Sequence, residues 1–422
     1  MLDWNRLLSA RRPASREADP VDPARSPFQK DFDRIVFSSA FRRMQDKTQV
    51  HPLSGNDYIR TRLTHSMEVA SVGRSLGAGV GYVIARRRNL DQRITPAEFG
   101  HIVSAACLAH DIGNPPFGHM GEELIARWFA ESHMGQRLVR GLPREQQGDF
   151  LKFEGNAQGF RILTALQNWQ GDGGFRLTAA TLGTFTKYPR FSATPPGDKT
   201  DAGSRKFGIM HTETAIWRWV ARETGLPEVR PGQWLRHPLC YLVEAADDIC
   251  YTIVDVEDGF KVGRLTFREA EEMLKAVAGN LKRYREINSE ERQIAYLRAK
   301  AIGRLIEQTI AVFLATETSM LEGRWRQSLL DDVPLNPVMQ HIGRVTAEKV
   351  FVRVEDYPGN VPAARVLARL MDHYMTAGIP GQPEAARLSG YSRIQAVTDY
   401  VSGMTDRFAV EQYEQLERRR RA

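Results

Sequence analysis

The stretch "CLAHDIGNPPFGHMGEE", Cys107 to Glu123, joins the end of an apolar helical pattern to a Gly-Asn-Pro-Pro break and then to a new polar segment. It contains two histidines and three carboxylates, which are side chains that bind divalent metals and transfer protons. A helix end can be polar for a simpler reason, because a histidine there interacts favourably with the helix dipole. By itself the stretch leaves both interpretations open.

The preceding apolar pattern predicts a helix with recognisable ends. It opens with Thr95, Pro96 and Glu98, which is typical of an N-cap, a first-turn proline and a capping-box glutamate. It should stop at Gly113, before the two prolines. His110 and the aspartate after it are then expected in its last turn.

Helical patterns also dominate the rest of the chain. Apolar residues recur at three- and four-residue spacing from Thr64 and from Ala301, whereas convincing strands are scarce. Residues 188–208 are rich in Pro, Gly and Ser and predict a long loop between helices. We expect a mainly α fold, divided into residues 1–265 and a helical C-terminal portion, 266–422, packed on them.

Composition indicates an ordinary globular protein. The 422 residues are 42% hydrophobic and 26% charged, and no run of about 18 apolar residues is available to span a membrane. The first residues lack the apolar stretch of a signal peptide, so a cytoplasmic protein without a membrane partner is expected. Cys107, Cys240 and Cys250 lie in apolar segments without C-x-x-C spacing and are interpreted as core residues.

The charge balance favours anionic partners. A formal net charge of +7 suits nucleotides or nucleic acid, but also plain solubility. Much of the excess lies in two short basic runs, residues 85–89 and the terminal "ERRRRA", which are typical of solvated surfaces. Charge alone does not choose among these partners.

Three predicted helices could bring metal ligands together. His65 lies near the start of one, His110 and Asp111 at the end of another, and Asp247 and Asp248 within the apolar third, "YLVEAADDICYTIVD". Carboxylates in an apolar helix need a metal or a cation beside them, because burying an unpaired charge is costly. Each signal is weak when taken singly.

The order His, His-Asp, Asp is that of the HD phosphohydrolases, and the resemblance extends further. The segments "FRRMQDKTQV", "RTRLTHSMEVA", "AHDIGNPPFGHMGEE", "FEGNAQGFRIL", "EAADDICYTIVD" and "SGMTDRFAV" together resemble the bacterial deoxyguanosine triphosphate triphosphohydrolase (dGTPase) family. They run from Phe41 to Val410, nearly the whole chain. The resemblance implies an HD-domain helical bundle with an additional helical C-terminal portion.

The resemblance also implies a metal centre and a catalytic pair. The implied ligands of a divalent ion, Mn²⁺ or Mg²⁺ with other transition metals as alternatives, are His65, His110, Asp111 and Asp247. Helix spacing supports Asp247 over its neighbour, because Asp247, Tyr251 and Asp255 share one face at i, i+4 and i+8. The implied catalytic pair is His119 and Glu122, and whether the histidine is acid, base or nucleophile stays open.

The family reaction is hydrolysis of a deoxynucleoside triphosphate to the deoxynucleoside and tripolyphosphate, through attack of water on the α-phosphorus. Arg62 and Lys187 are the candidate triphosphate ligands, with Arg60 as a weaker one for which a surface salt bridge is the competing interpretation. The resemblance assigns the sugar to Gln49, Tyr251 and Asp255, with the tyrosine ring excluding a 2′-hydroxyl. Tyr188 is a candidate for packing on the nucleotide or simply a core aromatic.

Two alternatives stay open from the sequence. Another HD-superfamily enzyme, a phosphodiesterase or a nucleotide monophosphatase, could use the same metal ligands but would have no use for the three sugar residues together. A nucleic-acid-binding protein with a vestigial HD site would suit the basic charge, yet the alternation of aromatic and basic residues that a stacking groove needs is missing. The family further implies a homo-oligomer, a hexamer among its forms, and single-stranded nucleic acid as an additional partner.

Overall fold

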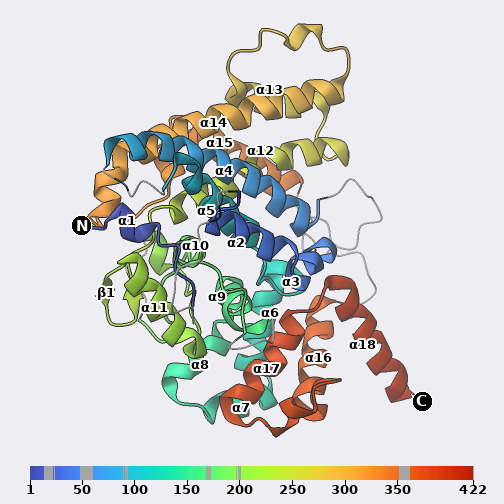
Figure 1. The fold of residues 1–422 in the computed structure, drawn as a ribbon. Helices are drawn as coiled ribbons and strands as arrows, with labels where there is room; N and C mark the ends of the chain where they lie inside the picture. Colours follow the sequence, from blue (N-terminus) through green and yellow to red (C-terminus); the bar gives the residue numbers. More distant parts are fainter. Residues whose placement is uncertain are drawn as a thin grey trace.

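The computed structural model describes residues 1–13, 22, 24–47, 60–88, 90, 94–167, 173–195, 197, 201–350 and 362–421. The predicted mainly α fold is confirmed (Figure 1). The α-helices are α1 (Trp4–Leu7), α2 (Pro27–Val36), α3 (Ser39–Arg43), α4 (Arg62–Arg87), α5 (Pro96–Ala109), α6 (Gly118–Glu131), α7 (His133–Arg140), α8 (Arg144–Leu151), α9 (Gly155–Arg161), α10 (Ala179–Phe185), α11 (Thr214–Thr224), α12 (Cys240–Lys261), α13 (Phe267–Ala278), α14 (Glu290–Leu321), α15 (Asn336–Lys349), α16 (Ala363–Ala377), α17 (Gly390–Ser402) and α18 (Asp406–Arg421).

Shorter elements fill the connections. They are the 3₁₀ turns η1 (Met44–Asp46), η3 (Ala202–Ser204), η4 (His211–Glu213), η5 (Tyr284–Glu286), η6 (Leu329–Asp332) and η8 (Pro383–Arg387), the π-helical turn η2 (Ile162–Leu166), and the strands β1 (Glu228–Arg230) and β2 (Gln233–Trp234). The two strands pair antiparallel. In the described part of the predicted 188–208 loop, the one regular element is the single turn η3.

The apolar side chains form two clusters. The first joins α1–α5 to α10–α15, and the second joins α6–α8 to α16–α18. Figure 1 shows α16 and α17 beside α6 and α7 at one end of the molecule, with α13 and α14 at the other. Helices on both sides of residue 266 contribute to each cluster, and the predicted division at that residue stays a prediction.

Helices α4 and α5 pack closely because glycines line their contact. A Cβ atom added at Gly77 would lie 2.6 Å from the carbonyl oxygen of Phe99, and one at Gly100 would lie 2.9 Å from that of Arg74. Both distances are too short for any larger residue. The helices run in opposite directions, so the start of α4 and the end of α5 meet.

The two ends of α5 differ from the prediction in detail. The helix begins at Pro96 as expected, but the Thr95 side chain makes no cap hydrogen bond. It ends at Ala109, not at Gly113. After the helix, the Ile112 N–H donates to the carbonyl oxygen of Ala109, three residues earlier (2.9 Å), which forms a tighter turn than an α-helix. His110 and Asp111 therefore lie in a turn beyond the helix.

The cysteine prediction is confirmed, since Cys107, Cys240 and Cys250 are buried free thiols. Among the described residues, no helix combines the length and the apolar character needed to cross a membrane.

Candidate active site

Four predicted metal ligands from three elements meet at one place. His65 comes from the first turn of α4, His110 and Asp111 from the turn after α5, and Asp247 from the middle of α12. The Nε2 atom of His65 lies 3.0 Å from Oδ1 of Asp247, and Nε2 of His110 lies 3.6 Å from the same oxygen and 3.5 Å from Oδ1 of Asp111. Donor atoms of the two histidines and Asp111 all lie within 4.8 Å of one another.

The charges of these side chains depend on one another. Burial alone would raise the pKa of Asp247, but the His110 and His65 imidazoles lower it to about 2. Arg62 and the same imidazoles lower the pKa of Asp111 against its own burial. Burial opposes the proton on His65, yet the hydrogen bond to Asp247 raises the pKa of this histidine above its usual value. The cluster thus holds charged carboxylates against imidazoles at neutral pH.

This donor set fits a divalent transition metal. Two imidazoles and two ionised carboxylates are suitable ligands for such an ion, and the facing side chains would gain from a cation between them. Asp248 differs from its neighbour because burial raises its pKa to about 7, although the positive charge of Lys187 opposes this shift. Asp247 is therefore the residue of the pair that contacts the histidines.

The predicted catalytic pair lies at the start of α6. Nδ1 of His119 is 2.9 Å from Oε2 of Glu122, as the three-residue spacing on a helix allows. The other carboxylate oxygen accepts a hydrogen bond from the Gly155 N–H at the start of α9 (2.9 Å). Lys206 Nζ lies 3.6 Å from Glu122 and 2.8 Å from Glu154.

These contacts set the protonation of the pair. The hydrogen bond to Glu122 raises the pKa of His119, whose side chain is 74% exposed. Burial would raise the pKa of Glu122, but His119 and Lys206 lower it overall. The pair is thus arranged as a proton-holding imidazole oriented by a buried carboxylate.

A cavity of about 230 Å³ connects the two groups. Its walls contain metal-ligand candidates, the exposed histidine of the pair, two lysines and other polar and apolar side chains: His110, Asp111, Asn114, His119, Asn156, Phe185, Lys187, Tyr188, Lys206, Cys240, Val243, Glu244 and Asp247. An anionic ligand in this cavity would face imidazoles and ammonium groups at the same time.

The predicted phosphate ligands have different surroundings. Lys187 lines the cavity with its Nζ 3.3 Å from Oε1 of Glu244, and Glu244 raises the pKa of this lysine against its burial. Arg62 is buried, and its Nη1 donates to Oδ2 of Asp111 at 2.5 Å. Arg60 instead pairs with Asp258 (3.0 Å) and with Glu68 (3.0 Å), and the pair with Asp258 is largely buried, whereas the competing interpretation is a surface salt bridge.

Two of the predicted sugar residues, Tyr251 and Asp255, lie on α12, one and two turns beyond Asp247. Tyr251 is 40% exposed. Oδ2 of Asp255 is buried and has no hydrogen-bond partner among the described residues, and burial raises the pKa of this carboxyl to about 7. Gln49 lies outside the described residues. Tyr188 is buried in the cavity wall, which suits both interpretations of it.

Sequence reasoning missed several residues of the cavity, and three of them contact other residues of the site. Lys206 lies in a Gly- and Ser-rich segment without periodicity, so no spacing signal could have selected it. Asn114 stands in the Gly-Asn-Pro-Pro break, and its Nδ2 donates to Oδ1 of Asp111 at 2.6 Å. Glu244 could have been found, because it precedes Asp247 by three residues and shares its helix face.

Comparison with known proteins gives the family. Residues 62–148 match the HD domain, and residues 335–415 match the phosphohydrolase-associated domain. The chain is 42% identical to a deoxyguanosinetriphosphate triphosphohydrolase-like protein of Synechocystis sp., over 98% of this chain and 99% of that protein. It is 39% identical to a protein of the same description from Pseudomonas aeruginosa, over 97% of each chain. A deoxyguanosinetriphosphate triphosphohydrolase of Yersinia pseudotuberculosis is 29% identical, over 98% of this chain and 99% of that protein.

These matches agree with the geometry. The HD domain is an all-helical, metal-dependent hydrolase fold, and its matched range contains the His-His-Asp cluster. The relatives cover the chain from end to end, so the resemblance inferred from the motifs is confirmed. The chain belongs to the deoxyguanosinetriphosphate triphosphohydrolase-like family of HD-domain hydrolases.

Proposed function

We propose that this protein hydrolyses deoxynucleoside triphosphates, dGTP or several of them, to the deoxynucleoside and tripolyphosphate. The observation that carries the proposal is one cavity walled by metal-ligand candidates, by His119 and by two lysines. The names of the relatives support the nucleotide substrate. A site that only bound nucleic acid would have no need for buried imidazoles and carboxylates facing one another.

The four facing side chains supply the electrophilic part of the site. A divalent cation, Mn²⁺ or Mg²⁺, held by His65, His110, Asp111 and Asp247 would polarise phosphate oxygens and lower the pKa of water. The chain itself fixes these ligands. Asn114 donates to Asp111, and the buried Arg62 neutralises the second oxygen of the same carboxylate.

Cations of the chain bind the triphosphate. Lys187 and Lys206 both line the cavity, and each is held by a carboxylate, Glu244 and Glu154 respectively. Phosphate oxygens would take up the remaining donors of these ammonium groups, which carry three N–H bonds each. Positive charge fixed before the reaction stabilises the negative charge that develops on the phosphate oxygens as water attacks the α-phosphorus.

His119 transfers the proton. Water attacks the α-phosphorus, the bond from phosphorus to the 5′-oxygen breaks, and this oxygen must gain a proton to leave as a hydroxyl. Glu122 raises the pKa of His119 and so favours the protonated form of the imidazole. The buried Glu122 carboxylate, anchored by Gly155 N–H, orients the ring.

The sugar contacts Tyr251 and Asp255 on α12, with Gln49 as a further ligand. Oδ2 of Asp255 has no hydrogen-bond partner within the described part of the chain, which supports a hydroxyl ligand, because buried polar atoms without a partner are rare in folded proteins. The Tyr251 ring against C2′ would exclude ribonucleotides by steric contact.

A product assay tests the proposal. Purified protein with Mn²⁺ or Mg²⁺ should release tripolyphosphate from at least one of the four deoxynucleoside triphosphates, and His110→Ala should abolish this while its circular dichroism stays unchanged. His133→Ala, which alters an exposed histidine of α7, is the matched control and should retain activity. Release of pyrophosphate or of single phosphate would reject the assigned attack and favour another HD phosphohydrolase.

A further inference from the structure

The turn between Asp111 and His119 has an unusual backbone. Phe117 has a φ of 65°, in the left-handed region that side chains other than glycine rarely adopt. Its N–H donates to Oδ1 of Asp406 at 2.9 Å, and both residues are buried. Asp406 is the first residue of α18, nearly 300 positions later in the chain. A distant carboxylate therefore holds the conformation of this turn.

A second buried anchor binds the same turn. Lys47 donates from its Nζ to the carbonyl oxygen of Asn114 (2.5 Å) and to that of Ser402 at the end of α17 (3.2 Å). The Asn114 side chain in turn donates to Asp111. Three hydrogen bonds, through Lys47 and Asn114, thus connect the C-terminal helices to a candidate metal ligand.

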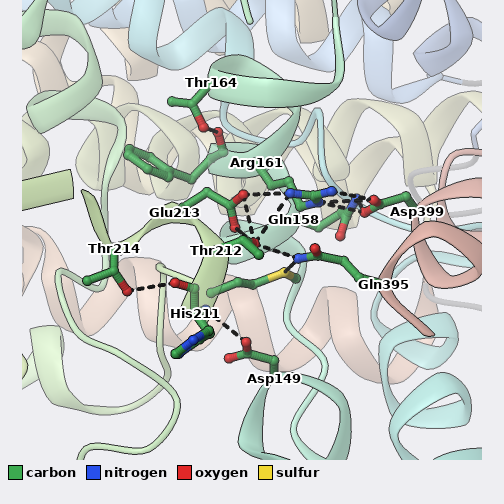
Figure 2. Close-up of polar contacts among 12 residues, drawn as sticks. Asp149, Gln158, Arg161, Thr164, His211, Thr212, Glu213, Thr214, Gln395 and Asp399 are labelled. Carbon is green, nitrogen blue, oxygen red and sulfur yellow. Dashed lines mark hydrogen bonds and ion pairs between the residues drawn. The ribbon is translucent and has the colours of Figure 1, made fainter. Parts of the chain in front are cut away.

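The same C-terminal segment also anchors α9. Figure 2 shows Asp399 facing Arg161 and Gln158, and its oxygens accept from Arg161 Nη2 at 2.8 Å and from Gln158 Nε2 at 2.9 Å. Helix α9 begins at Gly155, whose N–H holds Glu122. The turn that precedes His119 and the helix α9 that holds Glu122 are therefore both hydrogen-bonded to residues 399–406.

We propose that Asp406 is a positioning residue, which keeps the 114–118 turn in the conformation that directs Asp111 and His119 into one cavity. The inference gives a role to the "SGMTDRFAV" segment, for which the proposed reaction has no direct use. Its catalytic consequence rests on the proposed function, whereas its effect on the turn does not. Asp406 makes no contact with substrate in this role and acts through the Phe117 amide.

Amide hydrogen exchange of the full-length chain, measured without nucleotide, tests the role directly. In Asp406→Ala the peptide spanning residues 112–122 should exchange at least about tenfold faster, because a charge-assisted hydrogen bond to the turn is lost. Asp406→Asn retains an acceptor oxygen and should restore part of the protection. Asp372→Ala is the control. Asp372 on α16 accepts a hydrogen bond from Trp128 Nε1 on α6 (3.0 Å), so this variant removes another bond between the C-terminal helices and α6, away from the turn.

Kinetics give the second measurement. With the nucleotide that the wild type hydrolyses, Asp406→Ala should lower kcat at least about tenfold with little change in KM, because the catalytic groups are misplaced while the phosphate ligands remain. Asp372→Ala should leave kcat within about twofold of the wild type. If Asp406→Ala does not fold, Lys47→Met removes the other anchor of the turn and is expected to give the same faster exchange.

Unchanged exchange in the 112–122 peptide of a folded Asp406→Ala or Lys47→Met would overturn the inference. An equal increase of exchange there in Asp372→Ala would do so as well, because the effect would then be general loosening. If Asp406→Ala exchanges faster as expected but the wild type hydrolyses no deoxynucleoside triphosphate, the proposed function is rejected and the role of Asp406 in the turn stays supported.

Discussion

Gly155→Ala should damage the active site while leaving the fold largely intact. A Cβ atom at this position would lie 2.4 Å from Oε1 of Glu122 and 2.5 Å from Oδ1 of Asn114. Both atoms are the ends of flexible side chains, so they can move away without displacing backbone. The other polar atoms of the same two side chains, Oε2 of Glu122 and Nδ2 of Asn114, orient His119 and Asp111.

The size of the effect follows from these distances. Ordinary van der Waals contact begins at 3.4 Å, so each side chain must retreat by about 1 Å. A misplacement of about 1 Å in a catalytic group can reduce the rate by about 100-fold, which corresponds to about 2.7 kcal/mol in the activation free energy. The free energy of unfolding should fall by about 1–3 kcal/mol, as for other overpacked sites.

The assay is kcat for tripolyphosphate release, together with urea unfolding of the same preparations. Gly303→Ala is the control, because this glycine is exposed within α14 and an added Cβ would meet nothing within 4 Å. It should retain full activity and gain about 0.5–1 kcal/mol of stability. A folded Gly155→Ala enzyme with kcat within about twofold of the wild type would refute the reasoning, since the glycine would then have no bearing on the pair.

Glu122→Gln removes the negative charge that helps to raise the pKa of His119, so the fall of kcat with rising pH should begin at lower pH. An unchanged pH profile of kcat would show that Glu122 does not set the protonation of His119. Tyr251→Ala should raise the turnover of ribonucleotides relative to deoxynucleotides, and an unchanged ratio would argue against steric exclusion by the ring. Burial raises the pKa of Glu213 to about 7, although Arg161 opposes this shift. Between the ordinary pKa of 4.5 and about 7, the folded state therefore binds more protons than the unfolded state, so the free energy of unfolding falls as pH rises through this window. Glu213→Gln should flatten that fall in urea unfolding between about pH 5 and about pH 8, whereas parallel curves for the two proteins would contradict it.

Local patterns predicted the elements better than their ends. The helix that starts at Pro96 follows from its proline and apolar spacing, because both act within one turn of chain. Its end at Ala109 did not follow, because the chain just beyond it is held by contacts distant in sequence, such as the hydrogen bond from Lys47 Nζ to the carbonyl oxygen of Asn114. The capping interaction of Thr95 failed although the sequence motif was present.

The candidate site divides in the same way. His65, His110, Asp111 and Asp247 could be named as candidates from the order of motifs, and the fold brings them together. Lys206 could not be named, because it reaches the cavity from an irregular segment whose course depends on contacts distant in sequence. Residues whose role depends on one long-range hydrogen bond leave no periodic signal.

The central claim is water attack on the α-phosphorus of a deoxynucleoside triphosphate. Turnover of dGTP and the other three nucleotides with Mn²⁺ in heavy-oxygen water, followed by mass spectrometry of both products, tests it most directly. We predict that the label enters the tripolyphosphate and that the deoxynucleoside carries none. Label in the deoxynucleoside, or pyrophosphate or single phosphate as the released product, would contradict the account.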